Sequence, residues 1–241
     1  MKIALLGHGA MGCLVEVRAR SARHEIGLIC TSRDSGAKPE ELSDRLQGHH
    51  VAIDFSVGPA VLKHATACVQ AGVPLIEGTT GWKEEEAEVR RVVQSQGGGM
   101  VFGANFSIGV NLFYRVVAQA AELFGKVDDY DAFIEEAHHK RKRDAPSGTA
   151  LRLRDIVLAH SPREVPVVST RAGHIPGTHR VGFDSAPDQI LLVHTARSRE
   201  GFAAGALAAA QWVIGRRGVF EFSEVLSEIL SAGQKERRDG K

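Results

Sequence analysis

The chain opens with a short apolar run that passes directly into a glycine-rich turn. The run covers residues 2–6, a helical pattern extends to about residue 21, and the turn between them reads Gly7-His8-Gly9-Ala10-Met11-Gly12. In dinucleotide-binding sheets the first glycine of such a turn makes the bend, the second admits a pyrophosphate and the third lets helix and strand pack closely. We therefore predict that residues 7–12 bind a dinucleotide. The alternative is an ordinary glycine-rich turn without a ligand.

Strand and helix patterns alternate through the first hundred residues. After the first strand the sequence predicts strands at 25–30, 51–55, 75–77 and 100–102, with helices at 58–71 and 83–96. Such alternation favours parallel strands joined by right-handed crossovers. We expect an α/β fold with a Rossmann-type doubly wound parallel sheet.

The pattern changes after residue 107. A helix is expected at 109–124, a strand at 131–136 and a helix at 151–160, followed by strands at 165–170, 177–183 and 189–195 and by helices at 201–214 and 222–230. Strand-like runs separated by turns rather than by helices favour an antiparallel or mixed sheet. The sequence thus predicts an inserted α+β mixed-sheet domain at 107–201, for substrate binding and oligomerisation. Residues 202–241 would return to the dinucleotide-binding domain at 1–106.

The residues after the second predicted strand bear on the choice of cofactor. They read Cys30-Thr31-Ser32-Arg33-Asp34. A carboxylate at such a strand end binds the ribose 2′-hydroxyl of NAD, whereas an arginine accommodates the 2′-phosphate of NADP. Because Ser32 and Arg33 precede the only acid, we predict NADPH, with use of NADH left open. A solvated loop cation is the alternative for Arg33.

Two more loops follow predicted strands of the same sheet and contain small or hydroxyl-bearing residues. Ligands of an open α/β sheet bind beyond the carboxyl ends of its strands, so we expect both loops to contact the cofactor. The candidate residues are Gly78, Thr79 and Thr80 in one loop, and Gly103, Ala104, Asn105 and Phe106 in the other. An ordinary turn is the alternative for each loop.

The segment 136–150 brings proton donors, cations and a helix start together. It contains His138 and His139, the basic run 140–143, and a Pro-Ser-Gly-Thr turn ahead of the helix pattern at 151–160. Histidines exchange protons near neutral pH, and the free N–H groups of a helix start bind anions. The segment predicts a site that holds a small acidic molecule and protonates it.

Other interpretations of this segment compete with that prediction. The two histidines could form a structural pair, or they could bind a metal. We expect no metal, because no further His or Cys lies at ligand spacing. The basic run could be a nuclear localisation signal or a nucleic-acid patch, but the formal net charge of +1 argues against it.

Residues 136–150 closely resemble the signature of the dihydrodipicolinate reductase family, Glu-x-His-His-x-x-Lys-x-Asp-Ala-Pro-Ser-Gly-Thr-Ala. The resemblance covers nearly the whole chain, through the glycine loop and the segments 53–56, 78–81, 104–107, 171–173 and 202–206. Two departures are modest: the glycine loop is shorter than in many members, and the acid often found after the second strand is missing.

The resemblance implies an NAD(P)H-dependent oxidoreductase that acts on a CH–CH group. It would transfer hydride to a cyclic dicarboxylate and give tetrahydrodipicolinate in lysine and diaminopimelate biosynthesis. It also implies a homotetramer built through the sheet domain. The residues implied are His138 and Lys142 for catalysis, and His139, Ser147, Gly148 and Thr149 for substrate binding. The alternative from another class is a non-catalytic Rossmann-type nucleotide-binding sensor, which needs no proton donors.

Composition restricts the partners and the compartment. Lys and Arg number 30 against 29 Asp and Glu, and no apolar run approaches the length of a membrane span, so we expect neither nucleic acid nor membrane binding. Cys13, Cys30 and Cys68 lie far apart and suit a reducing compartment. We expect a cytoplasmic protein without a leader peptide.

Overall fold

The computed structural model describes the backbone of residues 1–239 and the side chains of residues 1–232. The chain folds into two compact units, one formed by Met1–Ile108 with Arg199–Lys241 and the other by Gly109–Ser198. The limits of these units lie within a few residues of the limits expected from the sequence. The roles that the sequence assigns to the two regions stay predictions.

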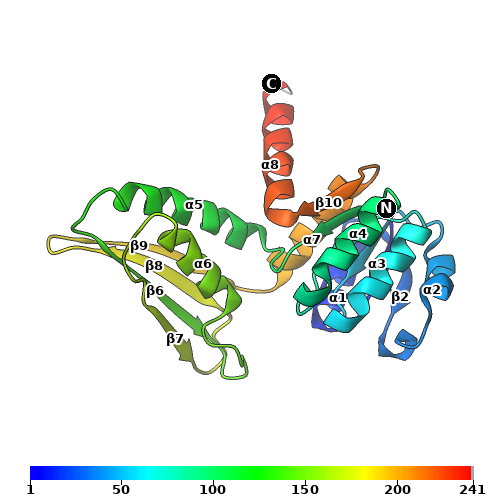
Figure 1. Cartoon of the computed structure of the whole chain (residues 1–241), viewed down its shortest axis with the longest axis horizontal. Coiled ribbons are helices and arrows are strands. Elements are labelled where there is room, and N and C mark those ends of the chain that lie inside the picture. Colours follow the sequence, from blue (N-terminus) through cyan, green and yellow to red (C-terminus); the bar gives the residue numbers. More distant parts are fainter. Residues whose placement is uncertain (240–241) are drawn as a thin grey trace. The chain divides into compact units, whose positions relative to one another are not determined.

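The first unit is built on a six-stranded sheet in which all strand pairs are parallel (Figure 1). Its order is β10-β5-β4-β3-β1-β2, with the bounds β1 Lys2–Leu6, β2 Glu25–Cys30, β3 Val51–Asp54, β4 Leu75–Glu77, β5 Gly99–Phe102 and β10 Gly218–Glu221. The chain runs from β1 to β2 on one side and then crosses to β3 on the other. Ligands of such sheets bind at this switch point, beyond the carboxyl ends of the strands. The predicted Rossmann-type parallel sheet is confirmed.

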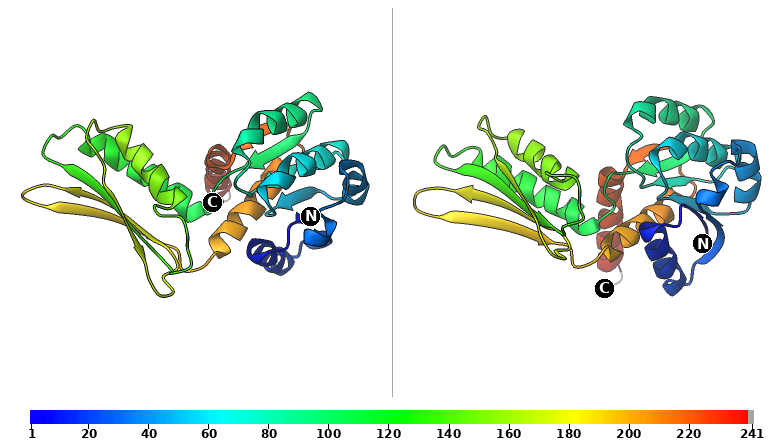
Figure 2. Two further views of the ribbon diagram at one scale, coloured as in Figure 1. Left: turned by 60° about the horizontal axis from the view of Figure 1, so that its bottom comes forward. Right: turned by 90° about the horizontal axis from the view of Figure 1, so that it is seen from below.

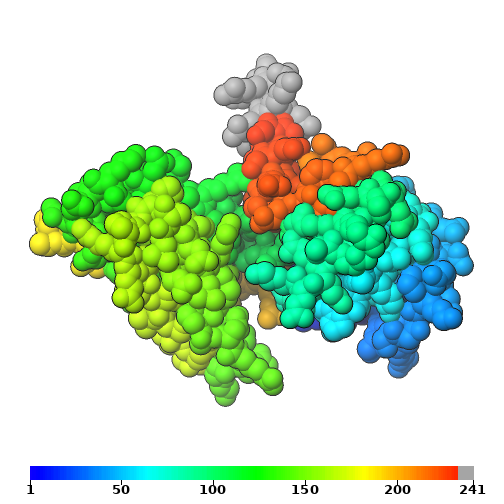
Figure 3. Space-filling view, viewed as in Figure 1, coloured from blue at the N-terminus to red at the C-terminus, as the bar shows by residue number. Residues whose placement is uncertain are grey.

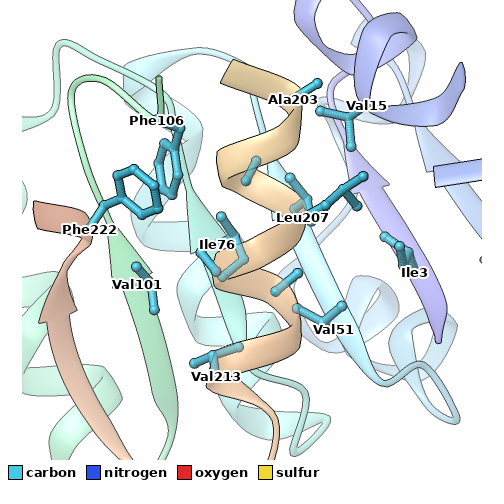
Figure 4. Close-up of a cluster of buried hydrophobic side chains, with 14 of the residues drawn as sticks. Ile3, Val15, Val51, Ile76, Val101, Phe106, Ala203, Leu207, Val213 and Phe222 are labelled. Carbon is cyan, nitrogen blue, oxygen red and sulfur yellow. The ribbon is translucent and has the colours of Figure 1, made fainter. Parts of the chain in front are cut away.

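Helices cover both faces of this sheet, and successive residues of each strand alternate between them. Ile3 and Leu5 face one buried cluster and Ala4 and Leu6 the other. The first cluster includes residues of α1 (Ala10–Ser21), α7 (Glu200–Val213) and α8 (Phe222–Asp239), and the second those of α2 (Pro39–Leu46), α3 (Val61–Gln70) and α4 (Glu86–Ser95). Figure 4 shows α7 lying along the first face.

Some elements differ from the sequence prediction. Helix α2 and strand β10 were not expected, because the first has only two apolar residues, Leu42 and Leu46, and the second is four residues long. Helix α8 continues to Asp239 instead of ending at residue 230. Figure 3 shows its first turns beside β10. No helix in the described part of the chain has the length and apolar character that crossing a membrane requires.

The second unit packs two helices against one face of a four-stranded sheet (Figure 2). The order is β7-β6-β8-β9, with the bounds β6 Asp131–His138, β7 Val167–Arg171, β8 Thr178–Asp184 and β9 Gln189–Thr195, and the helices are α5 Ile108–Phe124 and α6 Gly148–Leu158. Strand β6 pairs parallel with β7 and antiparallel with β8, so the sheet is mixed, as predicted. Strand β6 extends two residues beyond the predicted end, so that His138 is its last residue.

Candidate functional site

A pocket of about 490 Å³ opens at the switch point of the first unit. It is lined by residues 9–11 after β1, 55–58 after β3 and 78–80 after β4, with Arg199 at the start of α7. Six predicted cofactor residues line it: Gly9, Ala10, Met11, Gly78, Thr79 and Thr80. The pocket also contains Arg199, a cation that the sequence did not single out and that suits an anionic dinucleotide.

The glycines of the first loop are needed for close backbone approach. Gly7 has φ +93°, and a Cβ there would lie 2.7 Å from the carbonyl oxygen of Phe55. A Cβ on Gly12 would lie 2.2 Å from the carbonyl oxygen of Gly7. Gly9 precedes α1 and has open space around its Cα. Gly7 and Gly12 therefore shape the loop, whereas Gly9 leaves room for a phosphate at the helix start.

The other predicted cofactor residues lie outside the lining of this pocket. His8 Nε2 lies 2.7 Å from Glu16 Oε2, so the ring is held by a carboxylate of α1. Phe106 is 1% exposed and packs against Phe222 with ring centroids 4.6 Å apart. Its aromatic side chain belongs to the core, so only the backbone near it remains available to a ligand. The pocket lining likewise lacks Ser32, Arg33, Gly103, Ala104 and Asn105.

Two buried carboxyl groups lie directly behind the pocket. Asp54 and Glu77 are register partners at the carboxyl ends of β3 and β4, and neither is exposed. Asp54 Oδ2 lies 2.6 Å from His64 Nδ1, and its Oδ1 accepts the backbone N–H of Ser56 at 2.8 Å. Glu77 Oε1 accepts the backbone N–H of Thr79 at 2.7 Å. Burial and the negative charge of Asp54 raise the pKa of Glu77 well above its ordinary value.

This cluster fixes the loops that line the pocket. The hydroxyl of Thr79 donates to Asp54 Oδ1 at 3.3 Å and accepts the N–H of Ser56 at 3.0 Å, which ties the β3 loop to the β4 loop. The sequence pattern gave no sign of Glu77 or His64. Glu77 meets Asp54 through the register of β3 and β4, and His64 reaches Asp54 from α3.

In the second unit, His138 lies in a buried cluster with Glu136 and Arg171. Glu136 Oε2 is 2.5 Å from His138 Nδ1, and Glu136 Oε1 is 2.6 Å from Arg171 Nη2. Burial alone would favour the neutral carboxyl, but hydrogen bonds from Ser169, Arg171 and Ser147 lower the pKa of Glu136 to about 2. Burial lowers the pKa of His138, and the charge of Glu136 partly opposes that shift. The cluster can hold an imidazole in one orientation and stabilise its protonated form.

The other ring nitrogen of His138 lies beside Gly177. A Cβ on Gly177 would be 3.2 Å from His138 Nε2, and Gly177 has φ +133°. Glycine therefore leaves the approach to Nε2 open while the Glu136 carboxylate engages Nδ1. Glu136, Ser169 and Gly177 are functional candidates that the sequence did not assign a role.

A second buried histidine lies next to His138. The His179 and His138 rings are 5.1 Å apart, and Ser147 Oγ is 3.1 Å from His179 Nε2. Burial, with the positive charge of His138, lowers the pKa of His179 to about 4. Potential ligand atoms of Glu136, His138 and His179 lie within 4.8 Å of one another. Sequence spacing did not reveal this cluster, because His179 lies on a different strand, and the absence of a metal stays a prediction.

Lys142 lies in the loop between β6 and α6, which forms an exposed edge of this unit. Its Nζ is 2.8 Å from Asp144 Oδ1, and the Lys142 side chain is 25% exposed. The backbone oxygen of Asp144 accepts a hydrogen bond from Arg171. Arg171 thus connects the loop to Glu136. Arg141 and Arg143 are exposed, as the sequence interpretation of solvated cations requires.

The start of α6 presents its first residues next to this loop. Ser147 is the N-cap: its hydroxyl accepts the N–H of Ala150 at 3.2 Å, and its own N–H donates to Glu136 Oε1. Ser147 is 2% exposed, so its side chain already serves the protein itself. Gly148 is exposed, and Thr149 is partly exposed and hydrogen bonds to Tyr114. The helix start suits a carboxylate at Gly148 and Thr149 better than at the Ser147 hydroxyl.

Comparisons with known proteins place the chain among reductases. The model described as "Dihydrodipicolinate reductase, N-terminus" matches residues 1–106, and "Dihydrodipicolinate reductase, C-terminus" matches residues 109–226. A 4-hydroxy-tetrahydrodipicolinate reductase of Christiangramia forsetii is 35% identical over 95% of this chain and 99% of the relative. One of Haloarcula marismortui is 34% identical over 90% of this chain and 95% of the relative.

Solved structures agree on the fold. A dipicolinate-bound dihydrodipicolinate reductase from Paenisporosarcina sp. TG-14 superposes with a TM-score of 0.76 at 21% identity, covering 92% of this chain and 97% of the other. An amine dehydrogenase from Mycobacterium smegmatis superposes with a TM-score of 0.60 at 12% identity, covering 92% and 95%.

Proposed function

We propose a residue-level mechanism for this chain, which belongs to the dihydrodipicolinate reductase family. The chain is a 4-hydroxy-tetrahydrodipicolinate reductase of lysine and diaminopimelate biosynthesis, and thus an oxidoreductase that uses a nicotinamide cofactor. The observation that carries this function is the match of both family models, over 1–106 and 109–226. The finer proposals concern the cofactor, the roles of residues and the assembly.

The cofactor binds to the first unit, at the pocket beyond β1, β3 and β4. A reduced nicotinamide supplies hydride when it is bound. The start of α1 with Gly9 receives the pyrophosphate, and the loops containing Thr79 and Asn105 hold the nicotinamide half. Arg199 adds positive charge at the same pocket. We assign NADPH as the preferred cofactor because Ser32 and Arg33 are exposed after β2.

The second unit binds the cyclic dicarboxylate and supplies the proton. Hydride addition leaves negative charge on the conjugated ring system of the substrate, and a proton must neutralise it. His138 Nε2 is the proposed donor, and Lys142 is a second donor or electrostatic partner in the neighbouring loop. Glu136 stabilises the His138 imidazolium through Nδ1. His139, Gly148 and Thr149 contact the substrate carboxylates.

The role that we propose for Ser147 is indirect. Its hydroxyl caps α6 and bonds to His179, so Ser147 acts on the substrate by orienting the helix start instead of by direct side-chain contact.

We also propose a homotetramer that assembles through the second unit. The sheet face opposite α5 and α6 exposes Val168, Leu191 and Val193, at 61%, 47% and 53%. These apolar side chains flank the exposed Glu135–Arg180 ion pair on the same face, and such a mixture of apolar and charged groups supports an interaction surface. Light scattering should give four chains for the native protein. A Val193→Asp variant should lower that mass, and a monomeric native protein would contradict the assembly.

The reaction is tested by a coupled assay. Freshly formed product of dihydrodipicolinate synthase is supplied with NADPH, and the loss of reduced-nicotinamide absorbance is followed. We expect oxidation that depends on the synthase and falls strongly in a His138→Asn variant. The absence of oxidation with active synthase, while NADPH still binds, would favour the nucleotide-binding sensor instead.

A further inference from the structure

The only carboxylate in the loop after β2 is that of Asp34, and it hydrogen bonds to residues of the loop itself. Asp34 Oδ2 accepts the backbone N–H of Thr31 at 2.8 Å and lies 3.4 Å from the Thr31 hydroxyl. The Thr31 hydroxyl in turn accepts the backbone N–H of Arg33 at 3.3 Å. These reciprocal bonds form a capping box around a short helical turn, Ser32–Asp34. One oxygen of Asp34 is therefore occupied by the loop itself.

Arg45 occupies the other oxygen. Its Nη1 lies 2.8 Å from Asp34 Oδ1, and the Asp34 side chain is only 25% exposed. Arg45 belongs to α2, which is anchored in the core by the buried side chains of Leu42 and Leu46. The hydrogen bonds from Thr31 and Arg45 lower the pKa of Asp34. The carboxylate thus remains charged, paired and oriented into the loop.

Two further hydrogen bonds hold the loop after β2 in place. Lys63 Nζ of α3 donates to the backbone oxygen of Ser35 at 2.8 Å. The N–H of Gly7 donates to the backbone oxygen of Cys30 at 3.0 Å, which joins the end of β2 to the glycine loop. The orientation of Asp34 is therefore built into the first unit, next to the place where a dinucleotide's adenosine ribose binds in this class of sheet.

Recognition of an unphosphorylated ribose needs a carboxylate directed at the 2′-hydroxyl, and the same carboxylate repels a 2′-phosphate. In this chain both oxygens of Asp34 already have donors. Arg33 is exposed, and no ion-pair partner is found for it among the described residues. The charge that the loop offers outward is therefore positive.

We propose that Arg45 is a specificity-determining residue for a 2′-phosphorylated dinucleotide, and that it acts by holding Asp34 away from the ribose. Arg45 is a positioning residue: it neutralises and orients Asp34, while Arg33 and Ser32 meet the phosphate. Loss of Arg45 leaves the Asp34 charge unpaired and its Oδ1 free at the end of β2, which shifts the loop toward recognition of a 2′-hydroxyl. The inference rests on the proposed NADPH preference and deepens it.

The test compares Arg45→Leu, Asp34→Asn and the double variant with the native chain. Efficiencies, kcat/KM, are measured with NADPH and NADH, and dissociation constants for both cofactors are obtained by fluorescence titration. In Arg45→Leu we expect the NADPH-to-NADH ratio to fall about tenfold, the size expected for one unpaired charge near a surface phosphate. Binding of NADPH should weaken and binding of NADH should tighten.

The double variant decides how Arg45 acts. If Arg45 works through Asp34, removing the charge of Asp34 restores the ratio to within about threefold of the native value. If the double variant keeps the low ratio, Arg45 contacts the phosphate itself and the proposal is overturned. An unchanged ratio in Arg45→Leu overturns it as well. Arg45→Lys should retain most of the native preference.

Two controls separate this inference from the proposals it builds on. Arg91 forms a comparable exposed ion pair with Glu88 on α4, and Arg91→Leu should leave the ratio unchanged. A native chain that prefers NADH would remove the cofactor proposal, and a native chain without reductase activity would remove the proposed reaction. The titrations still report the effect of Arg45 in either case, because they measure binding alone.

Discussion

Glu136 Oε2 lies 2.5 Å from Nδ1 of His138, and both side chains are buried at the end of β6. The second oxygen of the same carboxylate is held by Ser169 and Arg171. The position of the carboxylate is thus set by groups other than the histidine. A fixed anion on Nδ1 keeps the ring in place and directs Nε2 toward Gly177.

The first prediction concerns Glu136→Gln. Because the Glu136 charge raises the pKa of His138 against the effect of burial, its removal lowers that pKa further. The protonated donor then exists only at lower pH. The midpoint at which kcat/KM falls with rising pH should therefore move down by about one unit, the low end of the effect of a neighbouring charge. The measurement is a pH profile of kcat/KM with saturating cofactor.

Glu135 provides the matched control for that variant. It is the adjacent residue of β6, lies on the opposite, exposed face and pairs with Arg180 at 3.4 Å. Glu135→Gln should leave the midpoint in place. A uniform loss of activity in Glu136→Gln with an unmoved midpoint would mean that Glu136 is only structural.

The second prediction concerns Lys142. Lys142→Ala removes a proposed donor and the partner of Asp144, so turnover should fall about a hundredfold or more, the range of general acid–base catalysis. NADPH binding should change little, because Lys142 belongs to the second unit. Arg141→Ala is the control, since Arg141 is an exposed neighbour in the same loop. Equal losses of turnover and NADPH affinity in Lys142→Ala would contradict the assigned role.

The third prediction separates capping from substrate contact at Ser147. Ser147→Ala removes the N-cap acceptor for Ala150 and the partner of His179, which should destabilise the protein by about 1 kcal/mol. For a chain of this size that loss lowers Tm by roughly 2–4 °C. Ser147→Thr should recover most of the stability, because threonine also caps helices. Calorimetry checks both variants, and native stability in Ser147→Ala with a large rise in substrate KM would favour direct contact instead.

Strand register explains why the cluster around His138 could be predicted only in part. His138, Lys142 and the Ser147-Gly148-Thr149 turn are contiguous, so the sequence shows them as one segment. Ser169, Glu136 and His179 meet because β7, β6 and β8 pair Glu136 with both of the others. No local pattern encodes that pairing, and the third histidine beside His138 was missed for this reason.

The sequence predicted the fold more completely than the site. Parallel strands buried on both faces give continuous apolar runs, and β1 and β2 begin and end at the predicted residues. Helix α2 was missed because half of its residues are charged and its two leucines are its only buried apolar side chains. That helix supplies Arg45, so the sequence also concealed the partner that occupies Asp34. The cofactor loop was therefore interpreted from the order of its residues, without knowledge of which were already paired.

The last prediction uses the buried carboxyl pair behind the cofactor pocket. Glu77 has a folded-state pKa raised by burial and by Asp54, so the folded protein keeps a proton that the unfolded chain releases above about pH 4.5. Stability should therefore fall as pH rises from that value through the folded pKa. Glu77→Gln imitates the protonated acid: its amide oxygen can still accept the N–H of Thr79, and no proton is lost.

Thermal unfolding at a series of pH values tests this expectation. The Glu77→Gln variant should show a flatter pH dependence above pH 5 and a higher Tm near neutral pH, by roughly 2–4 °C for each kcal/mol of removed penalty. Glu84→Gln, at an exposed glutamate of the following loop, should reproduce the native curve. If Glu77→Gln lowers Tm at neutral pH and keeps the native slope, the carboxyl is ionised in the folded protein and its charge stabilises the loops. The expected result would instead mean that a neutral Glu77 holds the β4 loop in place for the cofactor.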